Sequence, residues 1–406
     1  MSGKGESPAV ILLGANRSHW LTARALERAG FNAIGVNALD DPIVESGFGE
    51  WWEVDPTDAS ALLERIRKID SPQALLTATE GEALAAIELA EACGLSFPAP
   101  WPSDKWIQRQ TLNAIPGLHV NARLVSGKEE ILALFTPERR EWIIKPRASR
   151  GGSRGVYLAR KASDVFRQTN AREHGIVPMV AEEVLDGPQL TIDAVVHHGE
   201  SRVLGVGRNV KQTGANQVNV AIVWDDQSGE HVQSAQRLVQ DIADHLRIRH
   251  GLLHIEAAAT EQGLRPIEVA HRQGGGVVPD AVALACGQHP VITAVAPQRE
   301  PATNGKAAVV IVYLIAPPAR LAPQDEQPDL AALRETPFPG VADLMVFLPK
   351  NSRVPVLADT SARLGHVLAY GDTAEEAVAR AMTAAQSFTL LREDGEACPL
   401  LFPSFD

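Results

Sequence analysis

The sequence predicts a mixed α/β protein, and two segments near its start lead to this prediction. Residues 9–37 read as strand, turn, helix and strand, with Gly30 directly after the helix. Residues 74–97 repeat this order of strand, short loop, helix, glycine and apolar restart. Because strands that alternate with helices usually pair in parallel, we expect a parallel sheet covered by helices. Gly14 stands alone after the first strand, so the three-glycine dinucleotide fingerprint is missing and NAD binding is not expected.

Size, composition and charge narrow the class of protein. The 406 residues suffice for about two to three domains, and 45% hydrophobic with 22% charged residues is typical of a soluble globular chain. The longest apolar stretch, AAVVIVYLIA, is about half the ~20 residues that a membrane span requires, and the N-terminus lacks the apolar core of a signal peptide. The three cysteines lie far apart without metal-ligand spacing, which favours a reducing, cytoplasmic location. A net charge of −12 disfavours nucleic-acid binding, so a bound phosphate would belong to a small molecule.

The middle of the chain contains a loop of the kind that holds phosphate. The proline-rich residues 97–103 mark a domain boundary, and a helix follows with Ser103 as its candidate N-cap and Lys105 in its first turn. Residues 143–160, IIKPRASRGGSRGVYLAR, then read as a buried strand ending at Lys145, a glycine-rich cationic loop and a second apolar run. Free backbone N–H groups and cations in such a loop bind phosphate, but the same composition also makes ordinary hairpins.

Residues 250–276 read as a β-hairpin that carries two glutamates on one face. A three-residue loop, residues 261–263, ends with a glycine suited to the left-handed conformation. Centring the hairpin on Gln262 puts Glu256 directly opposite Glu268. Because facing like charges destabilise a sheet, we expect a hard cation such as Mg²⁺ between them.

Alternation of side chains along the two strands divides this hairpin into two faces. The polar face would hold His254, Glu256, Ala258, Pro266, Glu268 and Ala270, and the core-facing side Leu253, Ile255, Ile267 and Val269. The plainer interpretation of the polar face is that it simply points to water.

Taken in order, the motifs of this chain resemble those of the ATP-grasp superfamily. The matching set is Lys105, Lys145–Pro146, residues 151–155, residues 182–187 (EEVLDG), Glu256 and residues 268–276 (EVAHRQGGG). Two positions depart from the family pattern. Gln189 stands where the family usually has a glutamate that holds the ribose hydroxyls, and Ala270 replaces the asparagine of E-x-N-x-R. The resulting E-x-A-x-R variant is similar to that of bacterial L-amino acid ligases, the dipeptide synthases of the bacilysin type.

The resemblance implies an ATP-grasp fold in three parts. An N-terminal Rossmann-like α/β domain would span residues 1–100, a linker helix and lid subdomain residues 101–187, and a C-terminal mixed-sheet body with the hairpin residues 188–406. It further implies an ATP-dependent ligase that joins a carboxylate to an amine through an acylphosphate, with an amino acid as substrate and with ADP and phosphate as the other products. The alternatives are another ATP-grasp ligase, such as a carboxylase or a nucleotide-pathway ligase, and a nucleotide-binding regulator without catalysis.

The resemblance also assigns roles to individual residues. ATP is expected to contact Lys105, Lys145, Gly151, Gly152, Ser153, Gly155, Glu182, Glu183, Val184, Leu185 and Gln189. Mg²⁺, with Mn²⁺ as the alternative ion, would be held by Glu256 and Glu268, and Arg272 and Glu268 would serve catalysis. The substrate candidates are His254, His271, Gly274 and Gly275. The expected partners are a small carboxylate and a small amine, with no nucleic acid and no membrane, and a homodimer is left open.

Each of these assignments has a structural alternative. Lys145 also reads as a strand-end lysine, and Lys105 as a solvated one. The glycine loop also reads as a hairpin turn, and residues 182–185 as an interdomain connector. Arg272 could form a structural salt bridge, and histidines such as His254 and His271 are more often core or surface residues.

Overall fold

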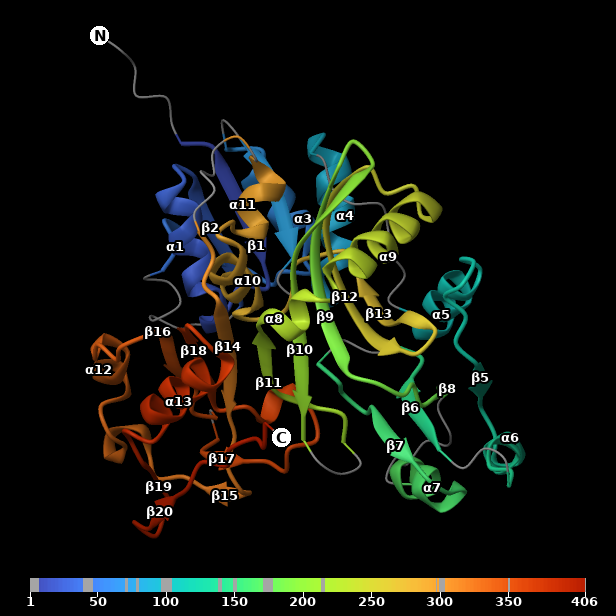
Figure 1. The fold of residues 1–406 in the computed structure, drawn as a ribbon. Helices are drawn as coiled ribbons and strands as arrows, with labels where there is room; N and C mark the ends of the chain where they lie inside the picture. Colours follow the sequence, from blue (N-terminus) through green and yellow to red (C-terminus); the bar gives the residue numbers. More distant parts are fainter. Residues whose placement is uncertain are drawn as a thin grey trace.

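The structure, a computed structural model, contains parallel and antiparallel sheets with helices packed on them (Figure 1). This confirms the predicted mixed α/β class. Three sheets of four or more strands form the framework of the described part of the chain. The structure describes residues 7–38, 47–69, 72–77, 80–95, 104–137, 141–148, 152–170, 178–212, 216–296, 298, 304–349 and 351–405.

The N-terminal sheet is parallel, as the alternation of strands and helices predicts. Its strands are β1 (Ala9–Leu13), β2 (Asn32–Asn37), β3 (Glu50–Glu53) and β4 (Pro72–Thr77), in the order β3-β2-β1-β4. Its helices are η1 (Arg17–His19), α1 (Trp20–Arg28), α3 (Ala59–Ile66), η2 (Glu80–Glu82) and α4 (Ala83–Cys93). Val10 and Leu12 pack with α1, whereas Ile11 and Leu13 pack with α3 and α4 on the opposite face. Because β1 is buried on both faces, it reads as a continuous apolar run.

The central sheet is antiparallel and lies at one side of the molecule (Figure 1). Its strands are β5 (Ala122–Val125), β6 (Trp142–Pro146), β7 (Tyr157–Ala159) and β8 (Met179–Glu183), in the order β5-β8-β6-β7. The helices of this region are α5 (Lys105–Asn113), α6 (Lys128–Leu134) and α7 (Ala162–Asn170). The N-cap of α5 is Asp104, whose carboxylate accepts the N–H groups of Trp106 and Ile107. The prediction of Ser103 as the N-cap was therefore wrong, and Ser103 itself lies outside the described residues.

The body sheet is antiparallel and has the order β13-β12-β9-β10-β11-β14-β18-β16. Its strands are β9 (Gln189–His197), β10 (Glu200–Lys211), β11 (Asn219–Trp224), β12 (His250–Thr260), β13 (Gly263–Ala270), β14 (Ala308–Leu314), β16 (Val341–Val346) and β18 (Gly365–Gly371). Two small sheets pair β15 (Ala319–Arg320) with β17 (Arg353–Val354) and β19 (Leu390–Leu391) with β20 (Ala397–Cys398).

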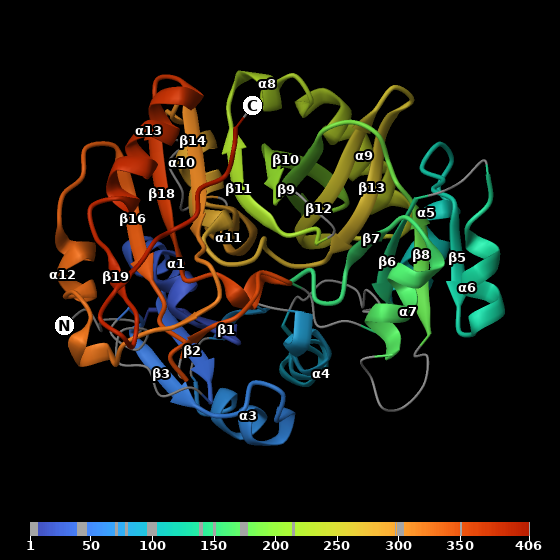
Figure 2. The same cartoon turned by 90° about the horizontal axis from the view of Figure 1, so that it is seen from below.

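Helices cover both faces of the body sheet. The helices of this region are α8 (Asp226–Gly229), α9 (Val232–His245), α10 (Val278–Cys286), α11 (Pro290–Val295), η4 (Gln324–Glu326), α12 (Leu330–Glu335), η5 (Thr360–Ala362) and α13 (Ala374–Ala385). Helix α9 packs on the hairpin end of the sheet and α13 on the C-terminal end, while α10 packs on the opposite face. Figure 2 shows α12 and α13 on one side of the molecule and the central sheet on the other.

We propose that the three sheets mark three structural units, with boundaries near residues 100 and 187. The segment from β8 to β9 passes from the central sheet to the body sheet, which supports the second boundary. The N-terminal sheet rests on the body through α1, which packs near α10 and α11 (Figure 1).

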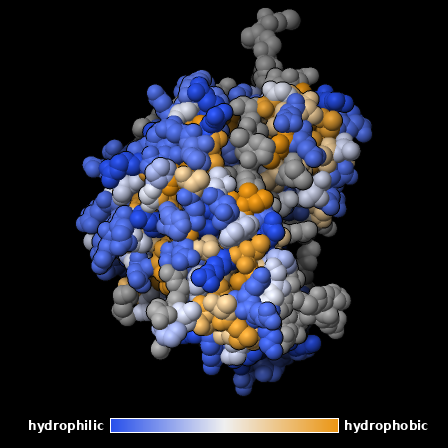
Figure 3. Space-filling model, turned by 90° about the vertical axis from the view of Figure 1, so that its right-hand side faces the viewer, coloured by the Kyte–Doolittle hydropathy of each residue, from blue (hydrophilic) through white to orange (hydrophobic). Residues whose placement is uncertain are grey.

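The lengths of the helices and the surface polarity bear on membrane contact. Within the described ranges, no helix has the length and apolar character needed to cross a bilayer. On the face drawn in Figure 3, hydrophilic residues dominate and apolar residues lie between them in small groups.

Candidate active site

A cavity of about 960 Å³ lies where the three sheets meet, and residues of all three regions line it. Of the residues predicted to form a site, it is lined by Lys105, Lys145, Gly152, Ser153, Glu182, Glu183, Val184, Leu185, Gln189, His254, Glu256, Glu268, Arg272 and Gly275. Gly155, His271 and Gly274 do not line it, and Gly151 lies outside the described residues. The structure therefore gathers most of the predicted residues, which are distant in sequence, around one space.

The hairpin pairs its two glutamates in the predicted register. Glu256 lies opposite Glu268 and His254 opposite Ala270. The turn is one residue shorter than predicted, because Thr260 pairs with Gly263. The register then shifts between Glu256 and Ala257, so that Ile267 is the extra residue of a bulge. The shorter turn and the bulge cancel, which leaves the two glutamates facing each other.

The bulge reverses the predicted faces of two residues. Ile267 lines the cavity, whereas Pro266 is buried opposite Ala257, a residue of the core under α9. The prediction had placed Pro266 on the polar face and Ile267 in the core, and it was wrong for both. The physical reason is the proline, which cannot donate to a strand ladder and is tolerated at bulges.

A buried arginine binds backbone carbonyl groups at this bulge, and the sequence analysis missed it. Arg109, 1% exposed on α5, donates to the carbonyl oxygens of Pro266 and Ile267, each at 3.0 Å. It also binds both carboxylate oxygens of Glu182, at 2.9 and 3.1 Å. Arg109 lies one helical turn after Lys105, and that spacing is the signal that could have indicated a shared face.

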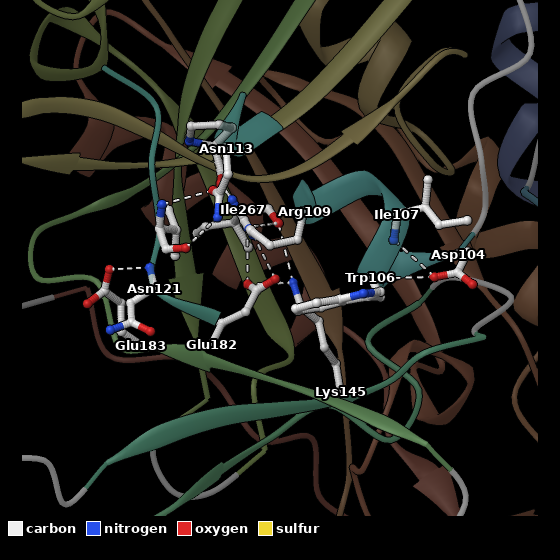
Figure 4. Close-up of polar contacts among 12 residues, drawn as sticks. Asp104, Trp106, Ile107, Arg109, Asn113, Asn121, Lys145, Glu182, Glu183 and Ile267 are labelled. Atoms are coloured by element: carbon white, nitrogen blue, oxygen red, sulfur yellow. Dashed lines mark hydrogen bonds and ion pairs between the residues drawn. The ribbon is translucent and has the colours of Figure 1, made fainter. Parts of the chain in front are cut away.

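Lys145 completes a buried cluster with Arg109 and Glu182 (Figure 4). Its ammonium lies 2.7 Å from Glu182 and 3.4 Å from the carbonyl oxygen of Ile267. Burial lowers the pKa of Lys145, and the Glu182 carboxylate only partly offsets this. Burial alone would raise the pKa of Glu182, but Lys145 and Arg109 outweigh it and hold that pKa below its usual value. Lys145 is thus a buried residue of the cavity wall, and its contact with phosphate remains a prediction.

Two lysines line the cavity together with the facing glutamates. Lys105, 5% exposed, lies 2.5 Å from a carboxylate oxygen of Glu268. Lys211 is partly buried at the end of β10, where burial lowers its pKa although Glu256 and Glu268 both oppose the shift. The repulsion between the two glutamates was the reason to predict a metal ion. Cations of the chain already offset this repulsion.

The two glutamates nevertheless suit Mg²⁺. Among the described residues no three His, Cys, Asp or Glu side chains cluster as a ready-made metal site. Mg²⁺ does not require one, because it keeps several waters and binds one or two carboxylates together with substrate phosphates. Glu256 and Glu268 both line the cavity and so could share an ion with a bound phosphate.

The described part of the glycine loop lies against a C-terminal segment. The carbonyl of Gly152 accepts the N–H of Thr360 at 3.0 Å, and Arg154 lies 3.7 Å from Asp359. Gly152 has φ +71°, and a Cβ there would lie 2.5 Å from Oγ1 of Thr360, so only glycine fits without a shift. The same C-terminal segment brings in Arg363, whose guanidinium stacks 3.5 Å from the Tyr313 ring centre. Both Arg363 and Tyr313 line the cavity, and neither was predicted.

His254 is neither a surface histidine nor an apolar core residue. Its Nδ1 lies 2.9 Å from a carboxylate oxygen of Asp193 on the neighbouring strand β9. Burial would lower the pKa of His254, but Asp193 outweighs burial and raises it.

The loop after β1 also reaches the cavity, although the sequence analysis gave it no role. Asn16, Ser18 and His19 line the cavity beside the residues of the body. The signal in the sequence is a run of polar residues placed directly after a buried apolar strand. His19 is 1% exposed, and burial lowers its pKa to about 4.

We expect His19 to make the protein less stable as the pH falls below about 6.5. The hydrogen bond from Asn16 opposes the effect of burial on the pKa of His19, and the charge of Arg272 adds to it. Between the unfolded value of 6.5 and the folded value of about 4, the unfolded chain binds more protons than the folded one. The free energy of unfolding should therefore fall across this window as the pH drops, by roughly 3 kcal/mol in total. Urea unfolding of wild type and His19→Gln across the window checks this, and equal pH slopes would contradict it.

Comparison with known proteins identifies the fold. Residues 139–280 match the family model of the ATP-grasp domain. This part of the chain is therefore similar to an ATP-grasp domain. Residues 329–390, which include the cavity residues Arg363 and His366, match the model of the L-amino acid ligase C-terminal domain 2. No curated protein sequence matches the chain.

Solved structures of three kinds share this ATP-grasp fold. An L-amino acid ligase from Bacillus licheniformis is similar with a TM-score of 0.74 and 16% identity, over 96% of this chain and 100% of that chain. N5-carboxyaminoimidazole synthetase from Staphylococcus aureus with ADP has a TM-score of 0.69 and 15% identity, over 93% and 96%. The biotin carboxylase domain of the 2-oxoglutarate carboxylase from Hydrogenobacter thermophilus, with MgADP and bicarbonate, has a TM-score of 0.65 and 14% identity, over 98% and 92%.

These findings confirm the predicted resemblance and the ATP-grasp fold. They also support the prediction of an ATP-dependent ligase that forms C–N bonds. At such low identities the structural likeness establishes the fold alone.

Proposed function

We propose that the protein is an ATP-dependent carboxylate–amine ligase that forms an amide bond through an acylphosphate, with an amino acid as the acid. The observation that carries the proposal is one cavity lined both by cationic residues and the glycine loop of the central sheet region and by Glu256, Glu268 and Arg272 of the body. The match of residues 329–390 to an L-amino acid ligase domain supports the amino acid substrate.

ATP would bind between the central sheet and the body sheet. Val184 and Leu185, on the segment that connects the two sheets, would line the adenine. Gln189 follows on the same segment, and its side-chain oxygen is buried without a hydrogen-bond donor among the described residues. That oxygen could accept a ribose hydroxyl, in place of the charged glutamate usual in this family.

The phosphates would lie among the cations at the other end of the cavity. Lys105, Lys145 and Lys211 all line it, and Gly152 and Ser153 supply backbone from the glycine loop. Glu256 and Glu268 would hold Mg²⁺, which neutralises charge on the transferring phosphoryl group when bound. Most of the catalysis is then positioning and charge stabilisation, as is general for phosphoryl transfer.

The chemistry requires two steps. A carboxylate oxygen of the acid attacks the γ-phosphoryl group, so that ADP leaves and an acylphosphate forms. The amine then attacks the acyl carbon, loses a proton, and expels phosphate. Arg272 is the cation that would stabilise the negative charge of the transferring group and of the tetrahedral intermediate.

A matrix of acids and amines tests this function. We expect ADP release to depend on one or a few of the twenty L-amino acids, to rise when the right amine is added, and to yield a product whose mass is acid plus amine minus water. ADP release without any new amide, or dependence on bicarbonate instead of an amine, would contradict the ligase assignment and favour a carboxylase.

A further inference from the structure

The loop after β1 reaches the cavity at a special point of the N-terminal sheet. β1 pairs with β2 on one side and with β4 on the other, so the strand order reverses at its carboxyl end. In open parallel α/β sheets, ligands bind in the crevice outside such a point. Asn16, Ser18 and His19 of this loop line the same cavity as Arg272. None of these three loop residues has a role in the ligase reaction as described so far.

The imidazole of His19 is fixed by its own loop. The side chain of Asn16 caps η1 by accepting the N–H of Ser18 at 3.0 Å. In return, the backbone N–H of Asn16 donates to Nδ1 of His19 at 3.2 Å. Because Nδ1 is an acceptor in this contact, the neutral ring carries its proton on Nε2.

Nε2 of His19 is a buried donor without an acceptor in the described part of the chain. The side chain is 1% exposed, and no described residue accepts a hydrogen bond from Nε2. Buried polar groups are nearly always paired, so a donor left over in a cavity wall indicates a ligand contact.

Arg272 defines the chemistry of that ligand. Arg272 lines the same cavity as His19, and its positive charge adds to the effect of burial that lowers the pKa of His19. A guanidinium and a neutral Nε2–H can only donate hydrogen bonds, so together they select a ligand with negatively charged acceptor oxygens. His254 also lies near Arg272, but Nδ1 of His254 is engaged with Asp193 at 2.9 Å.

We propose that His19 is a substrate-binding residue whose Nε2–H, together with the guanidinium of Arg272, holds the carboxylate oxygens of the acid that becomes phosphorylated. This inference rests on the proposed function, because the acid is that of the ligase reaction. His19 belongs to the N-terminal sheet region and Arg272 to the body, so the acid is held between these two parts of the chain.

Two substitutions test the roles of the two ring nitrogens of His19 separately. Asparagine replaces the part of the ring that carries Nδ1 and leaves nothing at Nε2, whereas glutamine can place an N–H near the Nε2 position. We expect His19→Asn to raise KM for the best amino acid about 10-fold or more, the effect of losing a hydrogen bond to a charged group. KM for ATP should change less than about twofold, and His19→Gln should return KM for the acid to within about threefold of wild type.

A binding measurement on the wild type makes the test independent of turnover and of variant folding. The protein is labelled with ¹⁵N-histidine, the His19 signal is assigned by its absence in His19→Gln, and each L-amino acid is added with Mg²⁺ and ADP present. We expect the acid that supports turnover to shift the His19 signal.

The outcomes distinguish this inference from the ligase proposal. If no acid releases ADP but one still shifts the His19 signal, the ligase function fails and the binding role of His19 stands. Equal KM values for the acid in wild type and His19→Asn, or a His19 signal that none of the twenty acids moves, would overturn the role of His19.

Discussion

Replacing Glu268 by glutamine is expected to lower acid-dependent ADP release by about 100-fold or more. Glu268 faces Glu256 across the hairpin, lines the cavity and is bound by Lys105. Glutamine preserves the shape of the side chain but removes its charge, so a divalent cation loses one of its two carboxylates. Steady-state ADP release by wild type and Glu268→Gln, at the same concentrations of ATP, acid and amine, measures the effect.

The same hairpin supplies a matched control. Glu261 lies exposed in the turn, and Glu261→Gln should keep ADP release within about twofold of wild type. Thermal unfolding adds a readout of binding, because a ligand that binds only the folded state stabilises it. Mg²⁺-ATP should raise the unfolding temperature of wild type and of Glu261→Gln but much less that of Glu268→Gln. Normal ADP release by Glu268→Gln would contradict the placement of the active site at this hairpin.

Replacing Arg109 by methionine is expected to lower the free energy of unfolding by about 3–5 kcal/mol, the range for breaking a buried ion pair on one side. Arg109 is 1% exposed and supplies both bidentate bonds to Glu182 and the donors for two bulge carbonyls. Without it, the buried Glu182 carboxylate retains only Lys145 among its ion-pair partners in the described structure. Chemical unfolding followed by circular dichroism measures the loss.

An exposed ion pair of the same central sheet region provides the control. Arg160 lies 2.8 Å from Glu141, and both side chains are exposed. Arg160→Met should cost no more than about 1 kcal/mol, because exposed pairs contribute little. The double variant Arg109→Met/Glu182→Gln should be destabilised by less than the sum of its single changes, because the two residues interact directly. Equal stability of Arg109→Met and Arg160→Met would show that the buried cluster does not hold the central sheet on the body.

The sequence was sufficient to predict features that depend on local periodicity. Strand–helix alternation indicated the parallel N-terminal sheet. Centring the hairpin on Gln262 also placed Glu256 opposite Glu268, but this pairing holds only because the shorter turn and the bulge cancel. The bulge at Ile267 was not predicted, because alternation assumes an uninterrupted ladder. Pro266 is the local clue to it, since a proline cannot complete that ladder.

Residues that act through tertiary packing could not be placed from the sequence. Nothing near Arg109 in the chain indicates Glu182, which lies 73 residues away. Arg363 reaches the cavity because β18 and its preceding segment fold back beside β14. His19 follows a strand whose end meets the body only once the N-terminal sheet has docked.

The fate of a carboxylate oxygen tests the central claim most directly. The acid is supplied with both carboxylate oxygens replaced by ¹⁸O, and the phosphate released during amide formation is analysed by mass spectrometry. An acylphosphate breaks between the acyl carbon and the bridging oxygen when the amine attacks, so the released phosphate should carry one ¹⁸O and the amide should retain the other. Phosphate without ¹⁸O, released at the same rate as ADP, would show that the acid is not phosphorylated and would contradict the ligase mechanism.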